Sequence, residues 1–433
     1  MRGLTSTIIL VVILGGLVGY IYFAPEGADP NAKPRAFALA SDQIEELQIR
    51  PAAGDTSRLQ RSGQNWQLAE PVKANADAGA VDTVASNIQS LEMQRVVDEN
   101  PSDLAQYGLN PARIDVGFRL RDQKEFQRLL IGDKTPAGGD LYAKRSDQNQ
   151  VFLVSSFVEA IFNKTPFDLR DKSILEFDRE QATEIEIVKG DIALHLAREG
   201  TDWRIVKPIA ARADYGSVEA VLTRLSSTDM QRVVSETGDG GPYGFERSPL
   251  SATVISGSSR ATLVFGQIAD GGGYFARDAS RSIVFTVEQA LPLEVGKDLI
   301  DLRRKDLFDS RSFSARRLEV RRGSETLAYE KVTTDGKDTW RTAAGQAIDA
   351  AKVETVLTNL SNIRAESFES AAPASLKTPV VTFTVGFDED KTETIAFGRS
   401  GDGVFASRTD EPGAAVVLTS AFDEALKAVD GLK

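Results

Sequence analysis

The sequence predicts an α+β protein in which an N-terminal transmembrane helix precedes three tandem repeats, each built of antiparallel β-meanders with two packed helices. Two observations indicate the repeats. The only three tryptophans, Trp66, Trp203 and Trp340, are spaced 137 residues apart, and the letters MQRVV occur at residues 93–97 and again at 230–234. A third observation indicates the transmembrane helix, because residues 4–23 contain no charged side chain.

The N-terminal apolar segment is long enough to cross a bilayer. As a helix, residues 4–23 would span about 30 Å, and Arg2 precedes them. A cleaved signal peptide is the alternative, but its apolar region would be shorter and would end in small residues. We therefore expect residues 1–23 to be a retained, single-pass membrane anchor. Residues 24–433 would then lie outside the cytoplasm.

Gly15 and Gly19 form a G-x-x-x-G spacing within this predicted helix. Small residues four apart allow a second helix to approach closely, so the pair is a candidate for packing against another membrane helix. Glycine is also common in membrane helices without such a role. The membrane bilayer is thus one expected partner of this chain.

The remaining chain divides into a linker and three repeats. Residues 24–37 are rich in Pro, Ala and Gly and are predicted to be a linker. The repeats are expected at 38–175, 176–308 and 309–433. Each begins with three short strand-like runs, the third of which carries the tryptophan.

A helix is predicted after the tryptophan strand of each repeat. Asp77, Asp214 and Asp349 each precede a valine by four residues, and aspartate is a good N-cap because its carboxylate accepts free N–H groups of the first turn. Apolar residues then recur at steps of three and four, which is typical of a helix that covers one face of a sheet. Four further strand-like runs and a closing helix complete each repeat, giving a second meander.

The repeated MQRVV segment follows this helix in the first two repeats. Its arginines, Arg95 and Arg232, are candidates for contact with a partner. The alternative is that they are ordinary surface arginines beside buried valines. Glycine-rich loops, such as residues 271–273, resemble phosphate loops, but each joins two strands and is better explained as a hairpin turn.

The composition argues against several classes of function. The net charge of −12 argues against nucleic acid, and the absence of cysteine excludes disulfides and thiolate metal sites. His195 is the only histidine and lies in a strand-like run, so a multi-histidine metal site is excluded. We expect no cofactor, no metal site and no catalytic residues, and we expect that the protein is not an enzyme.

The order of several short motifs resembles a known family. These motifs are Trp66 with Pro71, Tyr-Gly-Leu-x-Pro at 107–111, Ile-Gly-Asp at 131–133, Tyr-Ala-Lys at 142–144 and Leu-Arg-Asp-Lys at 169–172. Together they resemble the bacterial family called domain of unknown function 4340, in tandem over residues 38–433. The third repeat departs from the pattern, because it lacks Tyr-Gly and the Arg-Asp-Lys tail. The resemblance implies a membrane-anchored extracytoplasmic protein, held in the bacterial inner membrane with its bulk in the periplasm and associated with gliding-motility-type ABC transporter systems. It brings no catalytic residues.

Three functions follow as hypotheses. The first is a membrane-anchored periplasmic accessory or scaffold subunit of an ABC-type transporter complex, non-enzymatic, with the permease and ATPase subunits as partners. The second is a periplasmic protein that binds a lipid, glycan or peptide between domains. The third is a cell-envelope hydrolase, for which the residues offer no recognisable catalytic arrangement.

Overall fold

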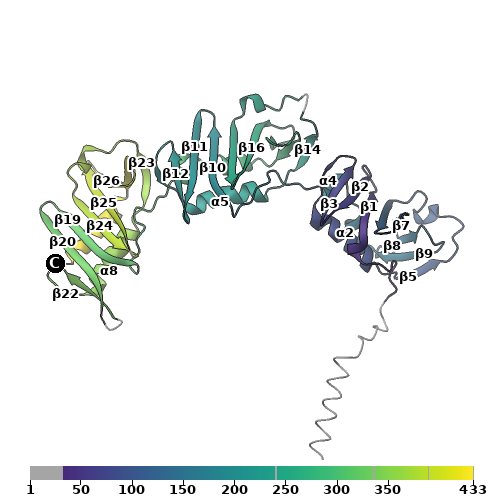
Figure 1. Ribbon diagram of the computed structural model, residues 1–433, viewed down its shortest axis with the longest axis horizontal. Coiled ribbons are helices and arrows are strands. Elements are labelled where there is room, and N and C mark those ends of the chain that lie inside the picture. Colours follow the sequence, from purple (N-terminus) through teal and green to yellow (C-terminus); the bar gives the residue numbers. More distant parts are fainter. Residues whose placement is uncertain (1–32, 239–240, 335–336, 389, 433) are drawn as a thin grey trace, which may run out of the picture. The chain divides into compact units, whose positions relative to one another are not determined.

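Three nine-stranded antiparallel sheets form the described part of the chain (Figure 1). The computed structural model describes residues 33–238, 241–334, 337–388 and 390–432. The chain divides into two compact units, Met1–Lys172 and Ser173–Lys433. The first unit contains the sheet of repeat 1, and the second contains the sheets of repeats 2 and 3. The tandem repetition predicted from the tryptophan spacing is therefore confirmed.

Repeat 1 contains nine strands, three α-helices and two 3-10 helices. Its elements in chain order are η1 (Ser41–Gln43), β1 (Ile44–Arg50), β2 (Ser57–Ser62), β3 (Asn65–Glu70), β4 (Ala74–Asn75), α2 (Ala78–Ser90), β5 (Arg95–Asp98), η2 (Ala105–Tyr107), β6 (Ile114–Leu120), β7 (Gln127–Lys134), β8 (Asp140–Arg145), β9 (Val151–Ser155), α3 (Val158–Phe162) and α4 (Pro166–Leu169).

Repeats 2 and 3 follow the same order of strands, with the long helix at the same place. Repeat 2 consists of β10 (Ala182–Lys189), β11 (Ile192–Glu199), β12 (Asp202–Lys207), β13 (Ala211–Arg212), α5 (Tyr215–Ser227), β14 (Arg232–Ser235), η3 (Phe245–Arg247), β15 (Leu250–Ser256), β16 (Ser259–Ile268), β17 (Tyr274–Asp278), β18 (Val284–Val287), α6 (Leu291–Val295) and α7 (Leu299–Leu302). Repeat 3 consists of β19 (Ala315–Arg322), β20 (Glu325–Thr334), β21 (Lys337–Thr342), β22 (Ala347–Ile348), α8 (Ala350–Ser361), β23 (Ala365–Glu369), η4 (Ala374–Leu376), β24 (Val381–Phe387), β25 (Lys391–Ser400), β26 (Gly403–Arg408), β27 (Ala414–Val417) and α9 (Thr419–Asp430).

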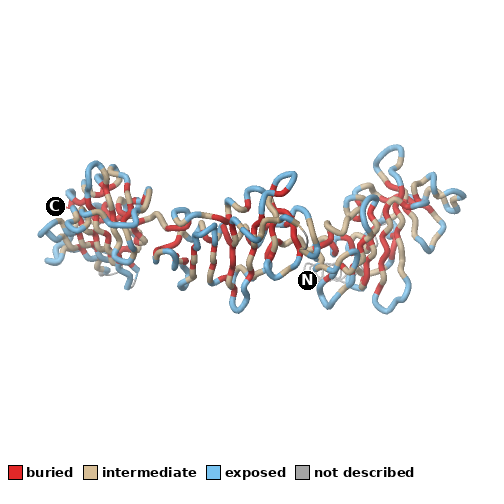
Figure 2. Tube along the Cα trace, turned by 90° about the horizontal axis from the view of Figure 1, so that it is seen from above, coloured by how far each residue is buried: buried red, intermediate tan, exposed pale blue. Residues whose placement is uncertain are grey.

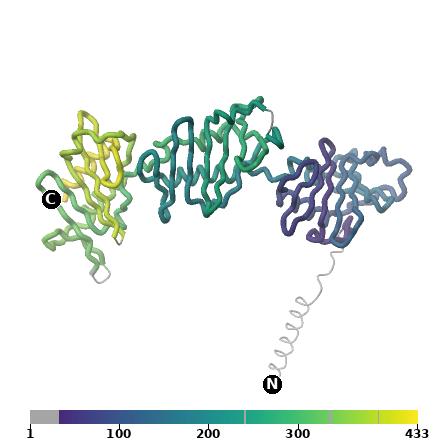
Figure 3. Tube along the Cα trace, turned by 45° about the horizontal axis from the view of Figure 1, so that its top comes forward, coloured from purple at the N-terminus to yellow at the C-terminus, as the bar shows by residue number. Residues whose placement is uncertain are grey.

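The predicted α+β class is wrong, because each repeat is mainly β and its two meanders are one sheet. The strand order in repeat 1 is β4-β3-β2-β1-β6-β7-β8-β9-β5. β1 pairs with β6 across a long connection, and this pairing joins the first meander to the second. β5 then pairs with β9 at the far edge of the sheet. The colour gradient in Figure 3 follows the meander through each repeat.

The long helix of each repeat covers one face of its sheet, as its sequence predicts. Asp77, Asp214 and Asp349 are N-caps whose carboxylates accept backbone N–H groups of the first turn, which confirms the predicted helix starts. The apolar stripe of α2 includes Val81, Val84 and Ile88, all fully buried. The equivalent stripes of α5 and α8 are also buried, so each helix closes a hydrophobic core.

Burial alternates along the strands because only one face of each sheet meets the helix. In β24, buried and partly buried residues alternate over the whole strand. Figure 2 shows buried residues along the strands and exposed residues in the connecting loops. The closing helix is split into two short helices in repeats 1 and 2, whereas in repeat 3 it is the single helix α9.

The predicted transmembrane helix and the single-pass inner-membrane localisation are corrected by the structure. Among residues 33–432, apart from the undescribed gaps, no helix is both long and apolar enough to cross a bilayer. The predicted span at residues 4–23, with Gly15 and Gly19, lies outside the described residues. An apolar run in a sequence sets only the length that a spanning helix could have.

Candidate functional site

An arginine in the same hairpin of each repeat binds the segment that leads into the sheet. Arg145 donates to the carbonyl oxygen of Ala36 at 2.7 Å, and Arg408 donates to that of Leu307 at 2.5 Å. In repeat 2 the corresponding bond is made by Arg281, which lies three residues beyond the equivalent position. Arg281 donates to the carbonyl oxygen of Ile174 at 2.8 Å. These bonds fix where the chain enters each sheet.

A buried carboxylate joins repeats 2 and 3. Glu411, in the turn between β26 and β27, accepts from Nε of Arg212 at 2.6 Å and from Nη2 of Arg303 at 2.8 Å. The three side chains are 4%, 9% and 6% exposed, in that order. The guanidinium of Arg303 also lies 3.8 Å from the ring centroid of Phe368 in β23. Because all three charges are buried, removing Glu411 would leave Arg303 without a counter-charge among the described residues.

The backbone places both arginines at this junction. Arg212 ends the edge strand β13, and the N–H of Arg304 donates to the carbonyl oxygen of Arg212 at 2.9 Å. The N–H of Asp214 donates to the carbonyl oxygen of Leu302 at 2.7 Å. The segment after α7 is therefore held along the edge of the repeat 2 sheet, and Arg303 points toward repeat 3.

The arginines determine the ionisation of the junction. Burial by itself would raise the pKa of Glu411, but the charges and hydrogen bonds of Arg212 and Arg303 outweigh it and hold this pKa below its usual value. Burial would likewise raise the pKa of Asp410, but its two hydrogen bonds from Arg408 lower it. Both carboxylates are therefore ionised at neutral pH.

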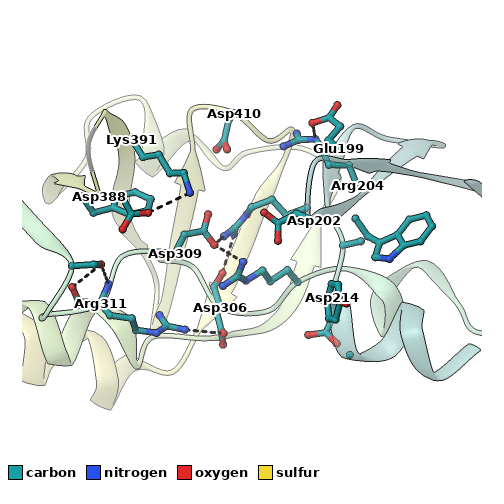
Figure 4. A pocket seen from close by; sticks show the side chains of 18 of the residues that line it. Glu199, Asp202, Arg204, Asp214, Asp306, Asp309, Arg311, Asp388, Lys391 and Asp410 are labelled. Carbon is teal, nitrogen blue, oxygen red and sulfur yellow. Dashed lines mark hydrogen bonds and ion pairs between the residues drawn. The ribbon is translucent and has the colours of Figure 1, made fainter. Parts of the chain in front are cut away.

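Beside this junction the two repeats line a cleft of about 700 Å³ (Figure 4). Its lining includes a set of ion pairs in which Asp309 accepts from Arg212 at 2.8 Å and from Arg304 at 2.7 Å. Asp306, which also lines the cleft, accepts from Arg311 at 3.5 Å. Figure 4 shows acidic and basic side chains facing one another from both repeats.

Two exposed aromatic side chains also line the cleft. Tyr215, at the start of α5, is 48% exposed, and Phe313, just before β19, is 83% exposed. An exposed aromatic beside paired charges is typical of surfaces that bind another protein, because the ring supplies contact area and the charges supply orientation. The cleft can therefore hold a polypeptide surface of mixed charge.

None of the predicted site residues that the structure describes lines this cleft. Arg95 begins β5 and Arg232 begins β14, and both are exposed. His195 lies in β11, where its Nε2 is 2.7 Å from Glu184, and its side chain is 24% exposed. Among the described residues no group of His, Asp and Glu side chains could hold a metal ion.

Sequence reasoning missed the junction residues. The repeated tail Leu-Arg at 169–170 and 302–303 contains Arg303 and was a usable signal, because a charged residue that recurs next to a buried leucine has a structural role. Nothing near Glu411 distinguishes it from other acidic turn residues. Its partner Arg212 is 199 residues away, so only the folded chain brings them together.

The fold and the junction define a class of protein, a tandem-repeat β protein in which buried ion pairs join repeats 2 and 3. The chain belongs to the family described as "Domain of unknown function (DUF4340)", whose model matches residues 66–202 and 203–379. Both matches begin in the strand that carries the tryptophan, which is the third strand of its repeat. Each match therefore begins in one repeat and ends in the next, so its boundaries differ from those of the sheets.

Comparisons with other proteins add little to this assignment. No curated protein matches the chain. A DNA polymerase sliding clamp from Pseudomonas aeruginosa is 9% identical, with 87% of this chain and 91% of the clamp covered at a TM-score of 0.17. A putative DNA polymerase III beta subunit from Eubacterium rectale is 7% identical, with coverage of 89% and 93% and a TM-score of 0.16. At such TM-scores these likenesses carry no argument about fold or function.

Proposed function

We propose that the protein is a non-enzymatic accessory and scaffold subunit of an ABC-type transporter complex, and that the cleft between repeats 2 and 3 contacts a partner subunit. The observation that carries the proposal is the buried Arg212–Glu411–Arg303 cluster beside the exposed Phe313. The cluster holds two sheets together as one surface, and the exposed ring of Phe313 offers apolar contact area to a partner.

The transporter is named as the partner because of the family resemblance described above. Relatives of this type are associated with gliding-motility-type ABC transporter systems, which suggests that this chain assembles with a permease and an ATPase. The mixed charge of the cleft suits a protein partner, since complementary charges orient an encounter and exclude wrong partners.

Affinity purification of the tagged full chain in mild detergent tests this function. We expect an ABC-type ATPase and a multispanning permease to co-purify, identified by mass spectrometry. Phe313→Ser should reduce their recovery, because it removes the exposed aromatic contact. Phe157→Ser is the matched control, because Phe157 is also highly exposed, at 61%, but belongs to repeat 1. Absence of both subunits from the wild-type sample would refute the proposal.

A second candidate function is the binding of a lipid acyl chain, and an apolar groove in the second unit favours it. The groove has a volume of about 1000 Å³ and is lined by Ile192 of β11, Ile300 of α7 and Phe368 of β23, among others. Ile192 is 58% exposed and Ile300 is 41% exposed. Binding of a fluorescent fatty acid that is lost in Ile192→Asp, but kept in Phe157→Ser, would support this function.

A further inference from the structure

We propose that the outer sheet face at β5 binds an acidic segment of a partner polypeptide, which Arg95 holds through a carboxylate and Tyr107 and Tyr142 hold through ring contacts. Repeat 2 carries a second such site at β14, with Arg232, Tyr243 and Phe275. The inference rests on the proposed interaction function and assigns a role to the repeated MQRVV segment.

The sheet register places the arginine and the aromatic ring in one row. Tyr142 of β8 is directly opposite Leu153 of β9, and Leu153 is directly opposite Arg95 of β5. Residues directly opposite one another on neighbouring strands share a face of the sheet. Arg95 and Tyr142 are therefore on the same face, two strands or about 10 Å apart.

The loop that contains Tyr-Gly builds an aromatic platform on that row. The rings of Tyr107 and Tyr142 are 5.0 Å apart, and the Tyr107 hydroxyl donates to Asp98 of β5 at 3.0 Å. The loop can lie this close because Gly132 has no side chain: a Cβ there would be 2.0 Å from the carbonyl oxygen of Tyr107. The platform is thus fixed against the sheet beside the edge strand.

Repeat 2 builds the same arrangement from different residues. Phe275 is opposite Thr286, which is opposite Arg232, and the ring of Tyr243 lies 5.2 Å from that of Phe275. Gly266 again allows the loop to approach, since a Cβ there would be 2.1 Å from the carbonyl oxygen of Tyr243.

Repeat 3 has lost the arginine and the loop tyrosine together. Its row is Phe405, Val416 and Ser367, so a serine stands where repeats 1 and 2 have arginine. The loop residue packed against Gly398 is Ser375 instead of tyrosine. The arginine and the loop tyrosine lie on separate elements, yet repeats 1 and 2 have both and repeat 3 has neither. We infer that the two residues contact one shared ligand.

Arg95 and Arg232 differ from other arginines of the chain in their pairing. Arg113 and Arg128 in repeat 1 are paired with carboxylates at 2.5 Å and 3.0 Å. In the part of the chain that the structure describes, Arg95 and Arg232 have no ion pair, although both are exposed. A carboxylate is the ligand that best matches a free guanidinium, because it accepts two parallel hydrogen bonds.

A polypeptide is the occupant that the edge position favours. β5 and β14 are the last strands in their sheets, so a bound extended segment would lie beside backbone at a sheet edge. The same edge strand already contacts another protein segment in repeat 3, where Phe368 of β23 packs under Arg303 of repeat 2. The occupant is therefore an extended segment with an acidic residue and an apolar neighbour.

A binding assay with the full chain tests this site. The probe is a short fluorescein-labelled peptide of alternating glutamate and valine residues, with glutamine and lysine versions for comparison. We expect the glutamate peptide to bind, and the double variant Arg95→Glu with Arg232→Glu to bind it about tenfold more weakly or worse. Arg321→Glu is the matched control, because Arg321 is also exposed and without an ion pair among the described residues, but lies on β19.

A second double variant, Tyr142→Ala with Phe275→Ala, tests the platform without changing charge, and it should also weaken binding. Equal binding by the wild type and the arginine double variant would overturn the proposal, as would equal binding of the glutamine peptide. Binding of polygalacturonate in place of the peptide would overturn the assignment to a polypeptide. Co-purification of the ATPase and permease is a separate readout, so failure of the proposed function would be distinguishable from failure of this site.

Discussion

The indole Nε1 of Trp203 donates a hydrogen bond to the carboxylate of Glu219 at 3.1 Å, which ties the third strand of repeat 2 to helix α5. Trp66 makes the same bond to Asp82 at 3.1 Å in repeat 1. Trp340 is equally buried, but its Nε1 has no acceptor among the described residues. Glu354 occupies the equivalent position, five residues after the N-cap, and makes no such bond there.

This difference predicts unequal effects of removing the two glutamates. Glu219→Ala should destabilise α5 by about 1–3 kcal/mol, because it leaves a buried N–H group without an acceptor. Glu354→Ala is the matched control and should change the stability of α8 by less than about 0.5 kcal/mol. Native-state hydrogen exchange of α5 and α8 amides measures both. Glu219 also pairs with Arg179 at 3.0 Å, so Arg179→Ala should be measured to separate that contribution.

Gly132 is predicted to be irreplaceable for a steric reason. Gly132→Ala should lower the free energy of unfolding of repeat 1 by about 3 kcal/mol or more, because the added Cβ would overlap the carbonyl oxygen of Tyr107. Gly139 serves as the control, since a Cβ there would meet nothing within 4 Å and its φ is not left-handed. Urea denaturation of the two variants compares them. Equal stability of both variants would show that the loop can move away at little cost.

The buried carboxylate of Glu411 should contribute much more to stability than an exposed ion pair does. Glu411→Ala should weaken the contact between repeats 2 and 3 by about 3–5 kcal/mol, because Arg303 would remain buried without a counter-charge among the described residues and Arg212 would keep only Asp309. Asp430→Ala breaks the ion pair between Asp430, which is 63% exposed, and Arg322, which is 26% exposed. This variant should lower the free energy of unfolding by about 1 kcal/mol or less. Hydrogen exchange at β13 and at the turn between β26 and β27 reports the opening. Similar exchange in both variants would contradict the prediction.

The junction should also be weakened by acid. The native pKa of Glu411 and that of Asp410 lie below their usual values, so the native state binds fewer protons than the unfolded state. Their stabilising contribution is present above the ordinary carboxyl pKa of about 4 and is lost as pH falls through the lowered native values. Urea unfolding of unit 2 measured from pH 7 down to pH 3 should show this loss. Glu411→Gln should flatten the dependence, and an unchanged profile would refute the assignment.

The sequence anticipated the local features of each repeat. Asp77, Asp214 and Asp349 cap helices as predicted, because a cap depends on residues within one turn of one another. The tryptophan spacing identified three repeats, because duplication preserves the order of elements. The sequence also identified Arg95 and Arg232 as equivalent positions, although it could not show that Tyr142 and Phe275 share their rows.

Predictions made from local sequence patterns were wrong where segments far apart in the chain pair with each other. The prediction of separate meanders was wrong because no feature of β1 reveals that β6 is its neighbour. The second unit's junction was invisible for the same reason, since Arg212 and Glu411 lie 199 residues apart. By itself, the sequence determined the repeat, the capped helices and the strand positions, which depend on contacts within a few residues. The tertiary structure alone decided the nine-stranded sheets, the buried charge cluster and the cleft, because long-range pairing and burial depend on the whole chain.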